Sequence, residues 1–177
     1  MLKLHGKLPV LNSITKGSYL VTVTKSATLP QVLRSQRALI GHPEDVGKGY
    51  KAILTNERQR QESYGESDVF TISTAHDYLG EGDIIRLDSA SGSFSCLYRR
   101  TSPNNTILLT EQCDHYCLMC SQPPKNVDDS WLLKEAFELI SLIPTETERL
   151  GFSGGEPTLY GDKFIELLHH TRRFLPN

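Results

Sequence analysis

One segment sets the interpretation of this chain: Thr110-Glu111-Gln112-Cys113-Asp114-His115-Tyr116-Cys117-Leu118-Met119-Cys120-Ser121-Gln122-Pro123-Pro124. It holds three of the four cysteines, spaced C-x3-C-x2-C. A strand-like run, Thr106 to Thr110, leads into it, and a Pro-Pro pair closes it. Clustered cysteines in a reducing compartment favour metal binding or catalysis over disulfide formation. We therefore interpret the segment as a metal-sulfur loop.

The composition is typical of a folded protein of one or two small domains. The chain has 177 residues, of which 38% are hydrophobic and 23% charged, with a net charge of −2. That charge gives no support for binding nucleic acid, which needs a basic face. No stretch approaches the roughly 20 apolar residues of a membrane helix, and the N-terminus lacks the apolar core of a signal peptide. We expect a cytoplasmic protein without nucleic-acid or membrane partners.

The first hundred residues are rich in strand signals. We expect residues 1–104 to form a small β-rich module that binds a partner or a peptide. Cys96 lies outside the cysteine cluster and reads as a half-buried strand residue. A helix is predicted after Pro30, over Gln31 to Leu39, because proline suits the first turn of a helix. The segment Thr55 to Ser67 is polar and reads as a loop. Strands are predicted at Ser18–Thr24, Tyr50–Leu54, Val69–Ser73, Ile84–Leu87 and Phe94–Tyr98.

The pattern changes after the polar segment Thr101 to Asn105, which reads as a domain boundary. Residues 105–177 run strand, loop, helix, strand, loop, helix. Such an order predicts two βα units with parallel strands. Loops that follow parallel strands meet on one face, so the cysteine loop and Ser153-Gly154-Gly155-Glu156-Pro157 are expected side by side. The elements are Thr106–Thr110, Trp131–Leu142 with Asp128-Asp129-Ser130 as its N-cap, Arg149–Phe152, and a helix from Asp162.

Three interpretations of the cysteines remain open. Thiolates suit both zinc and iron-sulfur clusters, and three cysteines on a four-iron cluster leave one iron without a protein ligand. Zinc would be held by Cys113, Cys117 and Cys120, with His115 as a candidate fourth ligand, although zinc sites usually have two separated cysteine pairs. The spacing i, i+4, i+7 also describes one helix face, so the cysteines could form a core stripe. Asp114 and His115 break such an apolar pattern.

The Gly-Gly-Glu loop allows two interpretations as well. Gly154 and Gly155 permit close approach of the backbone to a ligand, and exposed backbone groups can hold an amino or carboxylate group. Glu156 can pair with a cation. Alone, the tripeptide is equally consistent with a plain turn between a strand and a helix. Its position one βα unit after the cysteine loop favours a ligand site.

Together, these two motifs resemble the radical S-adenosylmethionine (SAM) superfamily. The resemblance implies an α/β fold, a partial radical SAM (βα) barrel of about two units that follows the β-rich module. It implies that Cys113, Cys117 and Cys120 ligate three irons of a [4Fe–4S] cluster, and that the amino and carboxylate groups of SAM chelate the fourth. The loop would bind SAM through Ser153, Gly154, Gly155 and Glu156, the last three holding its amino group. Met119 sits where the family usually has an aromatic residue beside the adenine.

The chemistry implied by the resemblance is reductive. A reduced cluster donates one electron to the sulfonium of SAM, and carbon-sulfur cleavage gives methionine and a 5′-deoxyadenosyl radical. That radical takes a hydrogen atom from the substrate. The protein would leave one iron open, orient the sulfonium and exclude water and oxygen. No residue is assigned a catalytic role of its own.

A narrower likeness concerns the substrate. Cys117 to Pro124, Arg99 to Asn104 and the β-rich module are similar to the His-Xaa-Ser system radical SAM maturases. This implies a peptide or small-protein substrate, with small proteins that carry His-Xaa-Ser repeats as the candidates, and an electron donor. A full barrel has about eight βα units, so with two units the chain is expected to be an incomplete fragment or to need a complementing chain. The competing hypotheses are a zinc-stabilised binding module and an inactive adaptor that binds a peptide.

Overall fold

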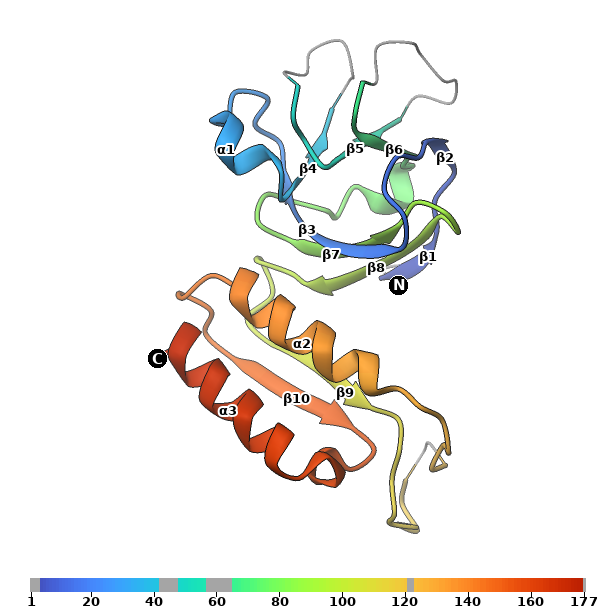
Figure 1. The fold of residues 1–177 in the computed structure, drawn as a ribbon, viewed down its shortest axis with the longest axis vertical. Coiled ribbons are helices and arrows are strands. Elements are labelled where there is room, and N and C mark those ends of the chain that lie inside the picture. The colour runs from blue at the N-terminus through green and yellow to red at the C-terminus, as the bar shows by residue number, and fades with distance from the viewer. Residues whose placement is uncertain (1–3, 42–47, 57–64, 121–122, 177) are drawn as a thin grey trace. The chain divides into compact units, whose positions relative to one another are not determined.

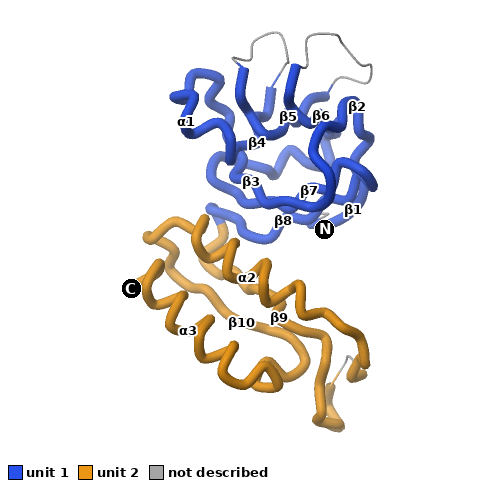
Figure 2. The backbone as a smooth tube through the Cα atoms, viewed as in Figure 1, with its two compact units in different colours: residues 1–101 blue, residues 102–177 orange. Residues whose placement is uncertain are grey.

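The structure is a computed structural model that describes residues 4–41, 48–56, 65–120 and 123–176. The chain divides into two compact units, residues 1–101 (unit 1) and residues 102–177 (unit 2), which Figure 2 shows in separate colours. The predicted loop Thr55 to Ser67 lies mostly outside the described residues.

Unit 1 is built on one mixed sheet of eight strands, in the order β1-β8-β7-β3-β4-β5-β6-β2 (Figure 1). In this order, the pairs β1–β8, β8–β7 and β7–β3 are antiparallel. The pairs β3–β4, β4–β5 and β5–β6 are parallel, and β6–β2 is antiparallel. The strands are β1 (His5–Lys7), β2 (Val10–Asn12), β3 (Ser18–Thr24), β4 (Arg37–Ile40), β5 (Ala52–Thr55), β6 (Asp68–Thr71), β7 (Ile84–Asp88) and β8 (Ser93–Tyr98).

The central strands carry many apolar residues and therefore lie in the core of unit 1. Strand β5 is buried along its whole length, as are the last five residues of β3. Continuous apolar runs of this kind are expected of strands covered on both faces. The buried cluster includes Val21, Val23, Leu54, Phe70 and Ile85.

The predicted helix over Gln31 to Leu39 is wrong in its second half. The helix α1 covers only Gln31–Arg34, and the chain continues as strand β4. Ala38 and Leu39 are almost completely buried and pair with β3 on one side and β5 on the other. Pairing and burial on both sides outweigh a weak local preference for helix. The three-residue strands β1 and β2 were not predicted, because so short a run shows no period.

Unit 2 follows the order β9 (Asn105–Thr110), α2 (Ser130–Leu142), β10 (Leu150–Gly154), the 3-10 helix η4 (Pro157–Tyr160) and α3 (Asp162–Phe174). Strands β9 and β10 are parallel, with Leu150 opposite Asn105 and Phe152 opposite Ile107. The helix α2 buries an apolar face at helical spacing, which accounts for its formation. That face comprises Leu132, Leu133, Ala136, Leu139 and Ile140.

Most predicted elements are confirmed to within two residues at either end, including the strand at Ser18–Thr24 and the helix at Trp131–Leu142. The predicted fold class is wrong. Among the described residues, eight of the ten strands form a mixed sheet with antiparallel pairs and three α-helices accompany them, so the fold is not an α/β (βα) barrel. In the described part of unit 2, β9 and β10 pair only with each other. Within the described ranges, no helix has the length and apolar character needed to cross a bilayer.

Candidate functional site

The carboxyl ends of β9 and β10 lie next to each other and bring two loops together. Gly154 pairs with Thr110 across a shift in the register. Beyond the strands, the Gly155 N–H donates to the Thr110 carbonyl oxygen at 2.9 Å, and the Glu156 N–H donates to the Gln112 carbonyl oxygen at 2.8 Å. The cysteine loop and the Gly-Gly-Glu loop are therefore adjacent, which confirms the prediction that loops after parallel strands meet on one face.

The glycines are required by this close approach of the two backbones. A Cβ atom at Gly154, whose φ is +152°, would lie 2.3 Å from the Thr110 carbonyl oxygen. A Cβ atom at Gly155 would lie 2.0 Å from the Gln112 carbonyl oxygen and 2.9 Å from the Cys113 Cβ. The glycines thus allow the Gly-Gly-Glu loop to pack on the start of the cysteine loop. In this structure the close approach is made to protein backbone.

A pocket of about 250 Å³ lies between the two loops. Six of the residues predicted to form the site line it: Cys113, Cys117, Cys120, Gly154, Gly155 and Glu156. Two others do not. Met119 is 96% exposed, and Ser153 lies exposed on β10. The pocket is also lined by His115, the candidate fourth zinc ligand, and by four residues that the sequence did not single out as ligands: Glu111, Pro123, Pro124 and Lys125.

The cysteine loop is closed at its base. The Lys125 N–H donates to the Glu111 carbonyl oxygen at 3.3 Å, and the Lys125 ammonium pairs with the Glu111 carboxylate. The opposite charges of Glu111 and Lys125 at the two ends of the loop were a sequence signal for this closure. These two contacts join the two ends of the cysteine loop.

The described cysteine loop is not helical, so the interpretation as a core stripe is wrong. Cys117 and Cys120 are exposed and Cys113 is half-buried. The Cys120 N–H donates to the Cys117 carbonyl oxygen at 3.0 Å, and the His115 N–H donates to the Cys113 Sγ at 3.4 Å. Thiols that are exposed to a pocket and turned away from a core are available as ligands.

Cys96 is separate from this site. It lies half-buried in β8 of unit 1, as predicted. Burial raises the pKa of its thiol to about 12, and the nearby Asp83 adds to that rise. Because a thiol with so high a pKa stays protonated at neutral pH, Cys96 is a poor metal ligand.

The spacing of the thiols distinguishes between kinds of metal site. Among the described residues, one group of three potential ligands has all its ligand atoms within 4.8 Å of one another, and it is Cys113, Asp114 and His115. The three thiols do not meet that limit, so at least one sulfur-sulfur separation exceeds 4.8 Å. Zinc-sulfur bonds of about 2.3 Å in a tetrahedral site would place the sulfurs roughly 3.8 Å apart. The three cysteines as arranged therefore do not form a tetrahedral site for one zinc ion.

Glu156 presents a negative charge at the wall of the pocket. The Thr158 hydroxyl and N–H donate to its carboxylate, at 2.5 Å and 3.0 Å, and hold the pKa of Glu156 below its ordinary value. The same carboxylate caps η4, which begins with Pro157. The His115 Nδ1 lies 3.8 Å from the second carboxylate oxygen. Glu156 is therefore ionised at neutral pH and can bind a cation.

The backbone N–H and C=O groups of the Gly-Gly-Glu loop differ in their hydrogen bonding. The N–H groups of Gly155 and Glu156 already donate to Thr110 and Gln112, so they are not free to bind a carboxylate. No hydrogen bond among the described residues uses the Gly155 carbonyl oxygen. With the Glu156 carboxylate, this oxygen suits an ammonium group, since both groups only accept hydrogen bonds.

Asp129 joins the segments that lead into the pocket by hydrogen bonds. Its side chain is 4% exposed and accepts hydrogen bonds from the Thr110 hydroxyl at 3.0 Å and the Glu111 N–H at 2.5 Å. Further donors are the Gln112 side-chain amide at 3.2 Å and the Tyr160 hydroxyl at 3.3 Å. Burial acts to raise the pKa of Asp129, but these donors together hold it below its ordinary value. One carboxylate thereby connects the start of the cysteine loop, the N-terminus of α2 and η4.

This role of Asp129 differs from the predicted helix cap. The Asp129 side chain makes no capping hydrogen bond, whereas the Asp128 carboxylate accepts from the Ser130 N–H at 3.1 Å. Tyr160, which also donates to the Leu109 carbonyl oxygen at 3.1 Å, gave no signal in the sequence. Its partners lie far away along the chain, and their proximity depends on the pairing of β9 with β10.

The comparisons with known proteins add no relative. No protein-family model matches the sequence, and no curated protein matches it. The resemblance to the radical SAM superfamily therefore depends on the motif residues and on their arrangement around the pocket.

Proposed function

We propose that unit 2 binds a [4Fe–4S] cluster and SAM, and that the protein is a radical SAM enzyme that modifies a peptide or small protein. One observation carries the proposal: the three cysteines and the Gly-Gly-Glu residues, from two loops distant in sequence, line the same pocket. Three thiols leave one iron of a cubane open for a cofactor. An external electron donor would reduce the cluster. We assign the activity to the cytoplasm, where thiols stay reduced.

The roles of the residues follow from their surroundings. Cys113, Cys117 and Cys120 would hold three irons, because thiolates are soft ligands that suit iron-sulfur clusters. The His115 N–H already donates to the Cys113 sulfur, and hydrogen bonds to the sulfurs tune such clusters. When bound and reduced, the cluster supplies the electron for carbon-sulfur cleavage of SAM. The protein fixes the loops and orients the cofactor for that reaction.

The amino group of SAM would be held by acceptors. The ionised Glu156 carboxylate and the Gly155 carbonyl oxygen offer charge and lone pairs to an ammonium group. The pocket volume of about 250 Å³ is below the roughly 300–1,000 Å³ of sites that enclose a drug-sized ligand. We therefore infer that the amino-acid end of SAM lies in the pocket and the adenosine extends beyond it. A role for Met119 beside the adenine stays a prediction, and the exposure of Met119 leaves its side chain accessible.

The test is anaerobic reconstitution of the full chain with iron and sulfide. About four irons per chain are expected, with an electron paramagnetic resonance signal of the reduced cluster that changes when SAM is added. Incubation with SAM and dithionite should release 5′-deoxyadenosine. Cys117→Ala should lose the iron, whereas the control Cys96→Ala should keep it. Colourless protein that binds one zinc and no iron would contradict the proposal.

A second candidate is a zinc-stabilised binding module, favoured by the compact group Cys113, Asp114 and His115. These residues supply sulfur, carboxylate oxygen and imidazole nitrogen, all of which bind zinc. Consecutive residues in an exposed loop often come close without a metal, so the group alone is weak support. Asp114→Ala should abolish zinc binding if this candidate holds, and should leave the iron content unchanged if the cluster proposal holds.

A further inference from the structure

One edge of the first strand of unit 1 is unpaired within the part of the chain that the structure describes. Strand β1 lies at the end of the sheet and, among the described strands, pairs with β8 alone. The Leu8 N–H donates to the Gly92 carbonyl oxygen, and the Leu4 carbonyl oxygen accepts from the Cys96 N–H. In an antiparallel pair, residues alternate between facing the partner strand and facing away from it. Because backbone groups of Leu4 and Leu8 bond to β8 and its preceding turn, the N–H and C=O groups of His5 and Lys7 point away from β8, at the edge of the sheet.

No hydrogen bond among residues 4–41, 48–56, 65–120 and 123–176 uses these four backbone groups. Unpaired groups of this kind form a template on which another strand can add. The geometry of β1 therefore supplies two donors and two acceptors at the spacing of a strand.

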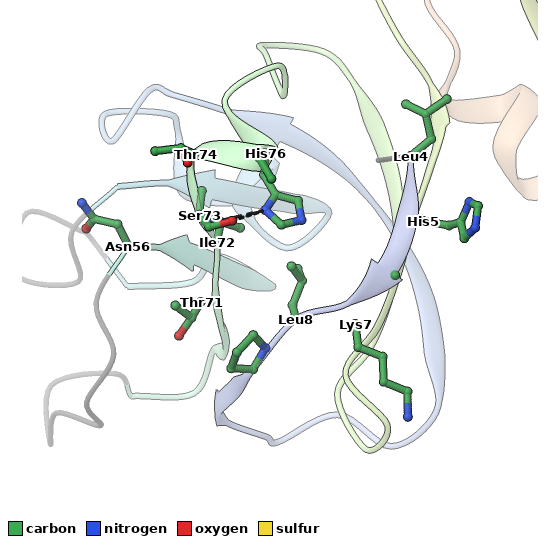
Figure 3. Close-up of a pocket in the computed structure, with 13 residues that line it drawn as sticks. Leu4, His5, Lys7, Leu8, Asn56, Thr71, Ile72, Ser73, Thr74 and His76 are labelled. Carbon is green, nitrogen blue, oxygen red and sulfur yellow. Dashed lines mark hydrogen bonds between the residues drawn. The ribbon is translucent and has the colours of Figure 1, made fainter. Parts of the chain in front are cut away.

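A large pocket borders this edge. It has a volume of about 1250 Å³ and lies between residues 4–9 on one side and residues 71–76 on the other (Figure 3). Sites that enclose drug-sized ligands usually have about 300–1,000 Å³. Since β8 occupies the other edge of β1, the free edge is the one that borders the pocket. The space suits an extended segment placed about 4.8 Å from β1, the usual distance between strands.

The two faces of β1 differ in character. Figure 3 shows Leu8 pointing toward His76, while His5 and Lys7 point away from it. Leu8 is 3% exposed and belongs to the apolar core, against which Ile72 also packs. His5 and Lys7 are exposed and stand on the opposite face of the strand. The described lining residues include no aspartate or glutamate.

We propose that this groove binds an extended peptide that adds to β1 as a ninth strand and that alternates acidic and apolar residues. The backbone of the peptide would pair with His5 and Lys7. Because side chains of neighbouring strands meet on the same face, its acidic residues would lie beside His5 and Lys7. Its apolar residues would lie on the face of Leu8 and Ile72. Recognition by strand addition takes affinity from the backbone and specificity from alternate side chains.

This inference does not depend on the metal site, since it uses residues of unit 1 only. Peptide binding can therefore be tested without a cluster, and its failure would leave the proposal for unit 2 untouched. The pocket determines the class of peptide. Apolar and acidic side chains should alternate along the peptide because successive side chains of a strand point to opposite faces. The acidic residues are expected because Lys7 is basic and the described lining residues include no aspartate or glutamate.

The test uses the full chain and fluorescein-labelled peptides of eight residues, measured by fluorescence anisotropy. The first peptide alternates glutamate with valine, and the second alternates lysine with valine. The glutamate peptide is expected to bind about tenfold more tightly at low salt, with a smaller difference at about 0.5 M salt. A third peptide, the glutamate peptide N-methylated at every second residue, should bind about tenfold more weakly because it lacks donors for the edge.

Variants separate backbone from side chain. His5→Pro removes an outward N–H without removing a bond to β8, and should weaken binding about three- to tenfold, whereas His5→Ala keeps that N–H and should bind more tightly than His5→Pro. Lys7→Glu should reverse the preference between the two charged peptides. The control Lys16→Glu changes an exposed lysine outside the groove and should leave binding unchanged. Circular dichroism confirms that each variant is folded.

The proposal is overturned if no peptide binds, or if all three bind equally. It is also overturned if His5→Pro and Lys7→Glu bind as the unchanged chain does. Sedimentation shows whether the free chain dimerises. If it does, and if His5→Pro abolishes the dimer, the edge binds a second copy of the chain and the peptide proposal is overturned.

Discussion

Each unit contains a buried aspartate that collects hydrogen bonds from a loop and from a tyrosine hydroxyl. In unit 1, Asp68 accepts from the Ile14 N–H at 2.6 Å, the Thr15 N–H at 3.0 Å and the Tyr19 hydroxyl at 2.7 Å. In unit 2, Asp129 accepts from the Glu111 N–H at 2.5 Å and the Tyr160 hydroxyl at 3.3 Å, among others. The two carboxylates have the same role, since each accepts several hydrogen bonds from donors that are distant in sequence.

The surroundings of the two carboxylates differ. Asp68 is completely buried in a strand inside an eight-stranded sheet, and the loop that it holds joins β2 to β3. Asp129 stands at the N-terminus of α2, and its donors include the first residues of the cysteine loop. The comparison indicates that the same device stabilises a sheet in unit 1 and positions a candidate site in unit 2.

The largest effect is expected at Asp68. Asp68→Ala leaves two N–H groups and one hydroxyl without their acceptor, and should lower the free energy of unfolding of unit 1 by about 4 kcal/mol. Hydrogen exchange followed by mass spectrometry reports the two units separately. The exposed control Asp77→Ala should stay within about 0.5 kcal/mol of the unchanged chain. Equal exchange in the Asp68 and Asp77 variants would contradict the stabilising role.

The next effect is expected at Gly155, where unit 2 needs close contact between backbones. The Cβ atom of Gly155→Ala would collide with the Gln112 carbonyl oxygen, and should cost about 3 kcal/mol as the loops separate. The matched control is Gly151→Ala in β10, the strand that precedes Gly155, because its Cβ atom would meet its nearest neighbour at 3.6 Å. Fluorescence of Trp131, the single tryptophan, follows urea unfolding of unit 2. Similar midpoints for both variants would disprove the steric argument.

Asp129 should have a smaller effect on stability and a larger one on the site. Asp129→Ala is expected to cost about 2 kcal/mol in unit 2, because several of its donors lie near solvent and can bind water instead. It should also reduce the iron bound on reconstitution, while exchange in unit 1 stays unchanged. Full iron content in this variant would show that Asp129 stabilises unit 2 without positioning the cysteine loop.

The tyrosines test the comparison at the level of one hydrogen bond. Tyr19→Phe and Tyr160→Phe should each cost about 1 kcal/mol, the usual net value of such a bond. The Tyr19 bond to Asp68 is shorter, at 2.7 Å against 3.3 Å, so the loss should be larger in unit 1. Urea unfolding of both variants, monitored by exchange in each unit, measures the difference. A larger loss for Tyr160→Phe would reverse the order that we infer.

The smallest effect is expected on acidification, because a protonated carboxyl group still accepts hydrogen bonds. Burial acts to raise the pKa of Asp68 and of Asp129, yet their donors hold both pKa values below the ordinary value of 3.8. The contribution of each is therefore complete above about pH 4 and is lost as pH falls through the lower pKa of the folded state. Asp68→Asn and Asp129→Asn should flatten this acid limb in their own unit. Unchanged acid limbs would show that other groups control it.

Local patterns were sufficient for much of the fold and for part of the site. Alternation and β-branched residues located β3, and apolar residues at helical spacing located α2. The order of elements placed the cysteine loop beside Gly155, because parallel strands end at the same edge. The same patterns wrongly predicted that the helix after Pro30 continues over the residues of β4, and they wrongly predicted a barrel-type fold class. Local periodicity shows neither the neighbours of β4 nor the pairing of eight strands in one sheet.

The sequence by itself determined the identity and spacing of the candidate ligands, since C-x3-C-x2-C and Gly-Gly-Glu are properties of neighbouring residues. Only the tertiary structure decided which of them meet: six predicted residues line the pocket, while Met119 and Ser153 do not. It alone revealed that Asp129 joins three segments and that β1 has a free edge. The physical reason is that hydrogen bonds and strand pairing between distant residues depend on the path of the whole backbone, which no short stretch of sequence specifies.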